Sequence, residues 1–307
     1  MAPAVYLKTK TTGRITLEFD DKTDLEDGFT LYRQQDGGEW RELGRFGPIE
    51  NRSASFFIVD DRDRGFRLLD SFEGRELPVE ITAADGIGNL SITNPEREMA
   101  HDTRYCYQLL PFNSQGEADP ITPLCIRTNR DLKASDGRHK VSLNSGHAAN
   151  GGANIAVDVR DYDGAVLVKD TAGLVGELRE DWVGTRLIYV DDRASIDLSL
   201  YTSFKDSETR KTRNIPGFPS LELKSGLTLM SGRSGLNPGA LIFSNKLEQY
   251  ALFKVTGNNV RVVGLRFRGP SEDPSPDQKK TNGIYFNVAD ILDEISPEVP
   301  VSFRVTA

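Results

Sequence analysis

Short apolar runs, each followed closely by a turn, dominate the second half of the chain and constrain its fold most. They stand at 187–190, 221–223, 227–230 and 252–255, and most of them are closed by Gly, Asn or Ser. Gly and Asn reach left-handed conformations at low cost, so such closures favour sharp turns between short strands. The pattern is typical of strands stacked in parallel, where each coil buries its inward residues against its neighbours.

A different strand pattern fills roughly the first 130 residues. Ile15, Leu17 and Phe19 alternate with polar residues, so they share one face, as a half-buried strand requires. The sequence Asp36-Gly37-Gly38 predicts a hairpin turn after the next strand. The clearest predicted strands are 14–19, 29–33, 40–43, 89–93, 103–109 and 123–128. The chain is therefore predicted to be all-β, with two domains arranged in different ways.

The run from Asp102 to Gly116 resembles the end of a fibronectin type III domain. That family places a Tyr at a corner before its sixth strand, followed by alternating core residues and by Asn and Gly near the turn. Tyr105 corresponds to the corner Tyr, whose hydroxyl in such sandwiches hydrogen-bonds to upstream backbone. Two features depart from the family: Phe19 stands where a core Trp is common, and residues 48–85 are longer than the norm. The resemblance implies a β-sandwich over residues 1–130, with an insertion near 48–85.

The two cysteines, Cys106 and Cys125, have two interpretations. In the fibronectin-like arrangement they lie on adjacent antiparallel strands, where a bridge forms if the Cα atoms come within about 7 Å. Extracellular bacterial members often carry Cys on these strands, so the resemblance implies a disulfide and an oxidising compartment. Two small buried hydrophobic side chains are the alternative.

The C-terminal runs resemble the first coils of the pectin lyase-like β-helix family. The likeness rests on residues 225–229, 239–243 and 259–267 and extends over 187–286. It implies a right-handed parallel β-helix starting at 185 and running to 307, with 131–184 as a connector or cap. At roughly 20 to 25 residues per coil only a few coils fit. A truncation, a missing C-terminal continuation, an oligomeric partner over the open end, or a cap formed by Val288–Glu298 would account for so short a stack.

Three aspartates in the connector are a candidate calcium site. Asp158, Asp161 and Asp163 precede Gly164, and hard cations take several oxygen ligands from a tight turn. The spacing differs from that of an EF-hand, so a polar turn between two strands is the alternative.

A second acidic pair, Asp191 and Asp192, follows a predicted strand. In β-helix polysaccharide lyases, paired carboxylates hold calcium while a base removes a proton from the uronic acid. In glycoside hydrolases of the same fold, paired aspartates act as acid and base. The pair is a candidate for substrate binding, and a solvated strand end is the alternative.

Three arginines, Arg261, Arg266 and Arg268, lie within one predicted coil. Positions 266 and 268 share a face because side chains alternate along a strand. These side chains are candidates for contact with an acidic polysaccharide on the outer surface. Alternatively they are ordinary outward residues between the inward Val260, Val262, Leu265 and Phe267.

The charge balance excludes one class of partner and favours a soluble surface. The formal net charge is −8, and basic residues alternate with acidic ones, which argues against nucleic acid binding. No apolar run approaches the roughly 20 residues that span a bilayer. The first residues lack the pattern of a signal peptide. We therefore expect an extracellular or cell-surface protein, on the grounds of the implied disulfide and the family resemblances.

The sequence contains no complete catalytic set and leaves enzymatic activity undecided. The resemblances imply a carbohydrate-associated module that is non-catalytic in this chain. One alternative is a polysaccharide lyase or glycoside hydrolase acting on an acidic polysaccharide. Another is a structural, adhesion or fibre component.

Overall fold

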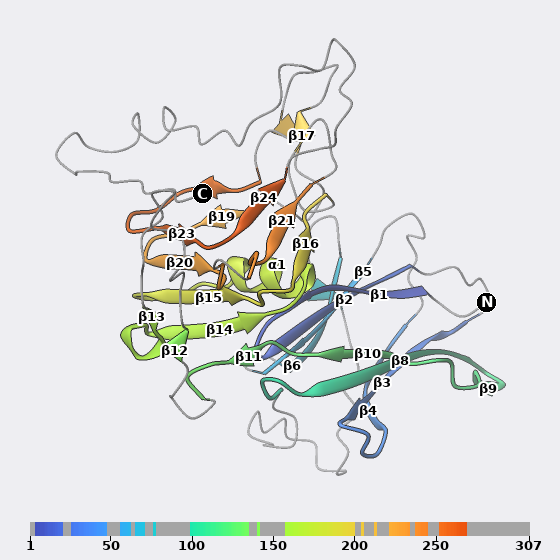
Figure 1. Cartoon of the computed structure of the whole chain (residues 1–307). Helices are drawn as coiled ribbons and strands as arrows, with labels where there is room; N and C mark the ends of the chain where they lie inside the picture. The colour runs from blue at the N-terminus through green and yellow to red at the C-terminus, as the bar shows by residue number, and fades with distance from the viewer. Residues whose placement is uncertain are drawn as a thin grey trace. The chain divides into compact units, whose positions relative to one another are not determined.

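The computed structural model is described here for a defined set of residues (Figure 1). They are 4–20, 26–47, 56–62, 65–70, 76–77, 99–134, 140–141, 157–199, 204–205, 212–213, 221–233, 237–244 and 252–268. These residues are mostly β-strand, and the all-β class predicted from the sequence is confirmed. The predicted strand at 89–93 and the predicted cap at Val288–Glu298 lie outside them. The chain divides into two compact units, Met1–Asn129 and Arg130–Ala307.

The first unit consists of two antiparallel sheets. One sheet has the order β1 (Ala4–Lys10), β2 (Arg14–Asp20), β5 (Phe56–Asp61), β6 (Gly65–Asp70) and β7 (Glu76–Leu77). The other has the order β10 (Leu124–Arg127), β8 (Arg104–Asn113), β3 (Gly28–Gln35) and β4 (Arg41–Phe46), and β9 (Gly116–Glu117) pairs with β8. Strands β5 and β6 fall within residues 48–85, so the segment expected to be an insertion supplies strands to the first sheet.

Both sheets contribute to one hydrophobic cluster. The predicted alternation on β2 is present: Ile15, Leu17 and Phe19 are all buried. The ring of Phe19 contacts those of Phe29 and Phe46 from the other sheet, with centroids 5.9 and 5.7 Å apart. Phe19 therefore fills the inter-sheet space at the position where the sequence lacks a Trp.

Tyr105 occupies the corner position at the start of β8. Its ring is fully buried, and its hydroxyl accepts a hydrogen bond of 2.7 Å from the backbone N–H of Ala100, upstream in the chain. Burial of the phenol raises the pKa of Tyr105 above its ordinary value, because the charged form would be poorly solvated. The contact fixes the chain where it enters the longest strand of the second sheet.

A buried ion pair joins the two sheets. Arg33 Nη1 on β3 donates to both carboxylate oxygens of Asp60 on β5, at 3.1 and 2.8 Å, and the hydroxyl of Tyr107 donates to Asp60 at 2.7 Å. The guanidinium also lies 5.3 Å from the centre of the Tyr105 ring. Taking two charges out of water is expensive, and it is offset here because several hydrogen bonds converge on the same carboxylate.

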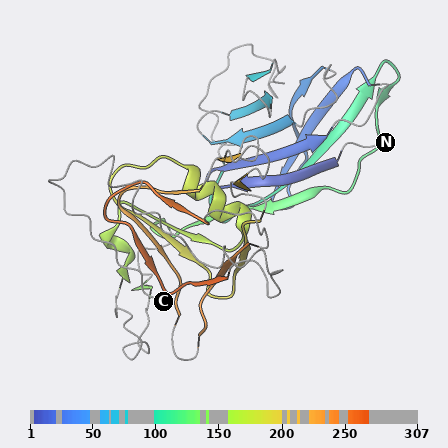
Figure 2. The same ribbon diagram turned by 90° about the horizontal axis from the view of Figure 1, so that it is seen from above.

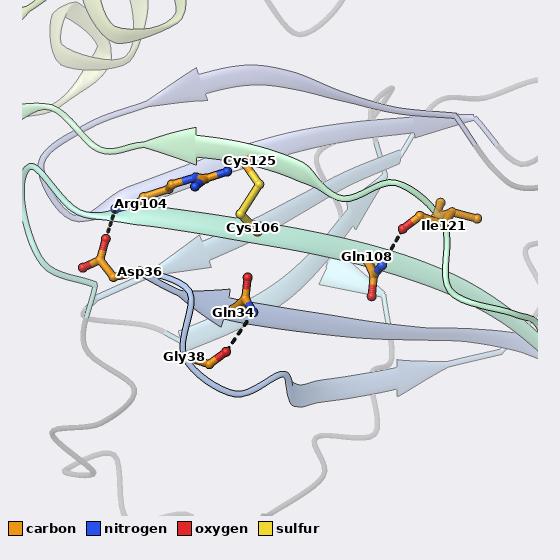
Figure 3. Close-up of a disulfide and its surroundings, with 8 residues drawn as sticks. All are labelled: Gln34, Asp36, Gly38, Arg104, Cys106, Gln108, Ile121 and Cys125. Carbon is orange, nitrogen blue, oxygen red and sulfur yellow. Dashed lines mark hydrogen bonds between the residues drawn. A yellow bond between two sulfur atoms is a disulfide. The ribbon is translucent and has the colours of Figure 1, made fainter.

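A disulfide links Cys106 on β8 to Cys125 on β10 (Figure 3). The two residues are direct partners in the antiparallel register, and their Cα atoms are 4.0 Å apart. Beside it, the side chain of Gln108 donates to the carbonyl of Ile121 in the segment leading to β10. The bond implied by the family resemblance is therefore present, and it fixes the last strand of the unit to its neighbour.

The second unit is built from three stacks of parallel strands, visited in rotation. The first stack is β14 (Gly164–Val168), β15 (Arg186–Val190), β20 (Leu227–Met230) and β23 (Arg261–Val263). The second is β16 (Ser195–Asp197), β21 (Leu241–Phe243) and β24 (Arg266–Arg268), and the third is β19 (Glu222–Leu223) and β22 (Lys254–Val255). Successive coils lie above one another in Figure 1 and overlap when viewed from above in Figure 2.

Short pairs complete the described strands of this unit. Strand β11 (Arg130–Asp131) pairs antiparallel with β14, so it extends the first stack by one strand. Two further antiparallel pairs are β12 (Lys140–Val141) with β13 (Val157–Asp158) and β17 (Phe204–Lys205) with β18 (Thr212–Arg213).

The stacks enclose an apolar interior. Val166, Ile188 and Leu229 are aligned in the register of the first stack and are fully buried in one cluster with Ile196 and Ile242 of the second stack. The opposite face of the first stack is also covered. A separate cluster there contains Leu132, Val157, Val159, Ala165, Leu187, Met230 and Val263.

Helix α1 (Thr171–Arg179) follows β14 and packs against the interior cluster through Leu174, Val175 and Leu178. Asp170 caps its first turn by accepting a 2.9 Å hydrogen bond from the N–H of Gly173. The range 131–184, expected to be a connector or cap, thus supplies α1 and the first long strand of a stack. Within the described residues there is no helix with the length and apolar character needed to cross a membrane.

The buried ion pair yields a stability prediction. Replacing Asp60 by Ala leaves the buried guanidinium of Arg33 without its counter-charge, so we expect the free energy of unfolding to fall by about 3 to 5 kcal/mol. Urea unfolding followed by tryptophan fluorescence measures this. The matched control is Glu42→Ala, which removes the partner of the exposed Arg45 and should cost less than about 1 kcal/mol. Equal losses in the two variants would contradict the role given to Asp60.

The disulfide yields a second prediction. Its cysteines are separated by 19 residues, and loop-closure entropy for a loop of this length corresponds to about 3 kcal/mol. We expect the Cys106→Ala, Cys125→Ala variant to lose about that much stability, and dithiothreitol to produce the same loss in the wild type. The reductant should leave the variant unchanged. A wild type that unfolds at the same urea concentration in both redox states would refute the prediction.

Candidate functional site

Several polar side chains of the second unit meet where the chain turns from the first stack to the second. This turn recurs in successive coils at residues 191–194, at 231–233 with 237–240, and at 264–265, which we call the stacked turns. Asp191 and Asp192 lie in the first of them, directly after β15. Because the coils are in register, each turn lies next to the corresponding turn of the following coil.

Asp192 is the centre of the stacked turns. Its Oδ1 accepts hydrogen bonds from the hydroxyl of Tyr189 at 2.5 Å, the N–H of Gly232 at 2.7 Å and the hydroxyl of Ser231 at 3.1 Å. Its Oδ2 accepts a bond of 2.6 Å from the side-chain amide of Asn237. Three of these four donors converge on Oδ1 and one reaches Oδ2, so the carboxylate is held both by its own coil and by the next one.

The hydrogen bonds continue from this carboxylate through the next coils. Ser231 Oγ accepts the N–H of Ala240 at 2.9 Å, and Asn237 Oδ1 accepts that of Gly239 at 3.0 Å. The carbonyl of Gly239 in turn accepts Nε and Nη2 of Arg266 at 3.1 and 3.0 Å. One continuous network therefore ties three successive coils together at this corner.

Glycines are required where the stacked turns touch. Gly239 and Gly264 have φ of 72° and 65°, in the left-handed region that favours glycine. A Cβ on Gly264 would stand 2.1 Å from the carbonyl oxygen of Ser231, and one on Gly239 would stand 2.4 Å from that of Gly264. The turns can approach this closely because neither residue has a side chain.

The environment of Asp192 keeps it ionised. Burial pushes its pKa upward, but the hydrogen bonds from Tyr189, Gly232, Ser231 and Asn237 outweigh burial, and the pKa lies below the ordinary 3.8. Burial, followed by the bond to Asp192, raises the pKa of Tyr189 above its ordinary value. A general acid at neutral pH needs a raised carboxyl pKa, and calcium needs accessible oxygens. The arrangement suits an anchor between coils better than either of those roles.

The neighbouring Asp191 faces a different partner. Its Oδ1 accepts the N–H of Arg193 at 3.0 Å, which closes the turn locally. The two aspartates proposed as a pair therefore make separate contacts, one within a turn and one between coils.

The three candidate arginines are divided between two stacks. Arg261 is exposed on β23 of the first stack, whereas Arg266 and Arg268 lie on β24 of the second. Arg268 lies with its guanidinium carbon 4.5 Å from the centre of the Phe243 ring on β21. The structure thus brings Arg266 and Arg268 to one face and puts Arg261 on another.

The candidate calcium ligands make local contacts. Asp158 accepts the N–H of Arg160 at 2.9 Å and pairs with its guanidinium. Asp163 accepts the N–H and hydroxyl of Thr185 at 2.7 and 2.9 Å, and these bonds lower the pKa of Asp163. Asp161 is exposed in the turn between them. Over the part of the chain that is described, no three His, Cys, Asp or Glu side chains form a group suited to a metal ion.

Sequence reasoning did not single out Tyr189, Ser231, Asn237 or Phe243. Ser231 and Asn237 meet Asp192 only because the coils stack, at sequence separations of 39 and 45 residues, whereas Tyr189 is 3 residues away on the preceding strand. The sequence offered two weak signals. One is the turn sequence Asn237-Pro238-Gly239. The other is that Phe243 and Arg268 each end a short run, 241–243 and 266–268, in successive coils.

Comparison with known proteins does not identify the chain. No protein-family model and no curated protein matches it. A solved structure described as a myokine structure is similar at 13% identity with a TM-score of 0.24, covering 41% of this chain and 95% of that one. A twitchin kinase region from C. elegans is similar at 10% identity with a TM-score of 0.23, covering 41% of this chain and 16% of that one. Scores of this size do not establish a shared fold, so function has to be argued from the residues.

The anchor role of Asp192 predicts a pH dependence. Because its pKa is lower in the folded state, its stabilising effect is full above the unfolded value of about 3.9 and is lost as the pH falls through the folded pKa. We expect Asp192→Asn to reduce the free energy of unfolding by about 2 kcal/mol at pH 7, with the gap from wild type narrowing below about pH 4. Urea titrations across pH measure it.

The control for this prediction is Asp191→Asn, which affects a contact within one turn. It should cost less than the change at Asp192. A gap between wild type and Asp192→Asn that stays constant from pH 7 to pH 3 would contradict the anchoring of a carboxylate in these turns.

Proposed function

We propose that the chain is an extracellular or cell-surface module that binds carbohydrate without cleaving it. In this proposal the first unit is a fibronectin type III-like sandwich, and the second forms the opening coils of a right-handed parallel β-helix. The proposal extends the family resemblances found in the sequence to the arrangement of the described strands.

The observation that carries the proposal is the order in which the chain contributes strands to the three parallel stacks, since the same order recurs in successive coils. Strands β15, β16 and β19 are followed in the same order by β20, β21 and β22, and each pairs in parallel with its counterpart one coil later. A surface built this way repeats side chains at the spacing of neighbouring strands, about 4.8 Å. Rigid, regularly spaced outward side chains suit an extended polymer with repeating units, such as a polysaccharide.

The chemistry of the stacked turns favours binding over cleavage. β-Helix lyases and hydrolases require carboxylates that can bind calcium or exchange protons. Asp192 has its oxygens engaged by four donors and a lowered pKa. A carboxylate held by these bonds, with a lowered pKa, is poorly suited to act as a general acid and serves the contact between coils.

The first unit supports an extracellular location. The disulfide between Cys106 and Cys125 forms and persists in an oxidising compartment. The inter-sheet cluster, the corner hydrogen bond of Tyr105 and the antiparallel pairing are features that a fibronectin type III-like sandwich would have. In extracellular proteins such a unit serves as a spacer or a binding module.

A glycan panel tests the proposal. The folded chain is titrated by calorimetry with acidic and neutral polysaccharides, and parallel assays follow unsaturated uronate formation and new reducing ends, with and without calcium. We expect saturable binding to at least one polysaccharide and no product. Turnover of any polysaccharide would replace the binding role by a lyase or hydrolase, and absence of binding across the panel would favour a purely structural module.

A further inference from the structure

The outward face of the second stack combines polar, apolar and cationic side chains. Along β16, β21 and β24 the central residues Ile196, Ile242 and Phe267 point into the interior cluster. Their neighbours on each side therefore point outward, since side chains alternate along a strand. The outward positions are Ser195 and Asp197 on β16, Leu241 and Phe243 on β21, and Arg266 and Arg268 on β24.

Two of these residues form a stacked cation and ring. Phe243 and Arg268 are direct partners in the parallel register, and the guanidinium carbon lies 4.5 Å from the ring centre. A guanidinium in this position is attracted by the ring, which accepts no strong hydrogen bond from its N–H groups. Arg268 is exposed, so a ligand in solution can reach its guanidinium beside the ring.

Arg266 is fixed in another way on the same face. Its Nε and Nη2 donate to the carbonyl of Gly239, and the side chain is half-buried. Arg266 and Arg268 are two residues apart on one strand, so their Cα atoms are about 6.6 Å apart. The two arginines therefore share one strand and one face, and each side chain is held by a different contact.

These cations differ from others in the described residues by the partners around them. Arg33, Arg160 and Arg186 each pair with a carboxylate. Among the residues that the structure describes, no carboxylate lies within ion-pair distance of Arg266 or Arg268. The chain as a whole has a formal charge of −8, and these two neighbouring cations give this face a local positive charge.

We propose that Arg266, Arg268 and Phe243 form a binding site for the acidic group of a saccharide, a carboxylate or a sulfate. This inference rests on the proposed carbohydrate-binding function and names its ligand class and site. The edge of the Arg268 guanidinium donates two parallel hydrogen bonds to the oxyanion, the geometry for which a planar fork is suited. Leu241 and the ring edge of Phe243 contact the apolar side of the sugar.

A carboxylate on the same face limits which ligands can bind. Asp197 aligns with Phe243 and Arg268, one strand further from the cation, and is exposed. At about 4.8 Å per strand it stands roughly 10 Å from Arg268 in the stacking direction. A densely charged polyanion such as duplex nucleic acid would meet this carboxylate, whereas a saccharide with spaced acidic groups can place hydroxyls there.

Arg268→Gln in the full chain tests the site, and Arg261→Gln is the matched control. Both changes remove one exposed arginine from the same coil, but Arg261 lies on the first stack. The probes are oligogalacturonate for carboxylates, a sulfated oligosaccharide for sulfates, and methyl-esterified oligogalacturonate as the neutral analogue. Affinity is measured by calorimetry at two salt concentrations, after circular dichroism and thermal unfolding verify that each variant folds like the wild type.

We expect Arg268→Gln to weaken binding of the preferred acidic probe by about tenfold or more, the range of a lost charge-assisted bond. Arg261→Gln should change it by less than about twofold, as is usual for a remote exposed charge. Arg268→Lys should recover only part of the affinity, since an ammonium keeps the charge and loses the fork. Phe243→Leu should weaken binding because it removes the ring that orients Arg268.

Several results would overturn the inference. Equal losses in Arg268→Gln and Arg261→Gln would mean that net charge alone attracts the ligand. Wild-type affinity in Arg268→Gln, or equal binding of the esterified and acidic probes, would remove the site while leaving a carbohydrate-binding function. A wild type that binds no saccharide in the wider panel would remove both.

Discussion

The second unit depends on in-register stacking of short parallel strands. No strand of three to five residues such as β16 or β15 can satisfy its backbone or bury its apolar residues alone. Each coil supplies the hydrogen-bond partners of the next, and Val166, Ile188 and Leu229 bury one another because the register aligns them. The same register decides which surface residues meet. Asp192 reaches Ser231, and Phe243 reaches Arg268, because the interior fixes the positions of the strands that carry them.

The first unit solves the same problem with two antiparallel sheets and a polar contact inside the core. Apolar rings such as Phe19 and Phe29 fill most of the space between the sheets. The pair Arg33–Asp60 lies in the same layer, and its charges are accommodated because Tyr107 also donates to Asp60. Such a pair contributes less to net stability than apolar packing would, but it accepts few alternative alignments of the two sheets. We interpret it as a restraint on register between the sheets.

Local patterns predicted strands well and predicted their partners poorly. The alternation at Ile15, Leu17 and Phe19 and the apolar run at 187–190 both correspond to observed strands. Strand β5 was assigned to an insertion because residues 48–85 are longer than the fibronectin type III norm, and its nearly continuous apolar run gives no period of two to mark a half-buried strand. Helix α1 was missed because Gly173 and Gly176 lower helix propensity, although Asp170 offered a capping signal. The disulfide was predicted from a family resemblance, because the presence of two cysteines in the sequence is equally compatible with two buried thiols.

The candidate site was the hardest part to predict, for a physical reason. The sequence offered charges, namely Asp191, Asp192 and the arginines, but a charge becomes a binding group or a structural anchor only through its neighbours. Asp192 is an anchor because donors from the next coil occupy its oxygens. Arg268 keeps its outward donors because its neighbour in the preceding coil is Phe243, which orients the guanidinium without accepting hydrogen bonds from it. The role of a charged residue on a parallel stack therefore depends on the residue next to it in the neighbouring coil. The number of residues between the two varies from coil to coil, because the connecting turns and loops differ in length.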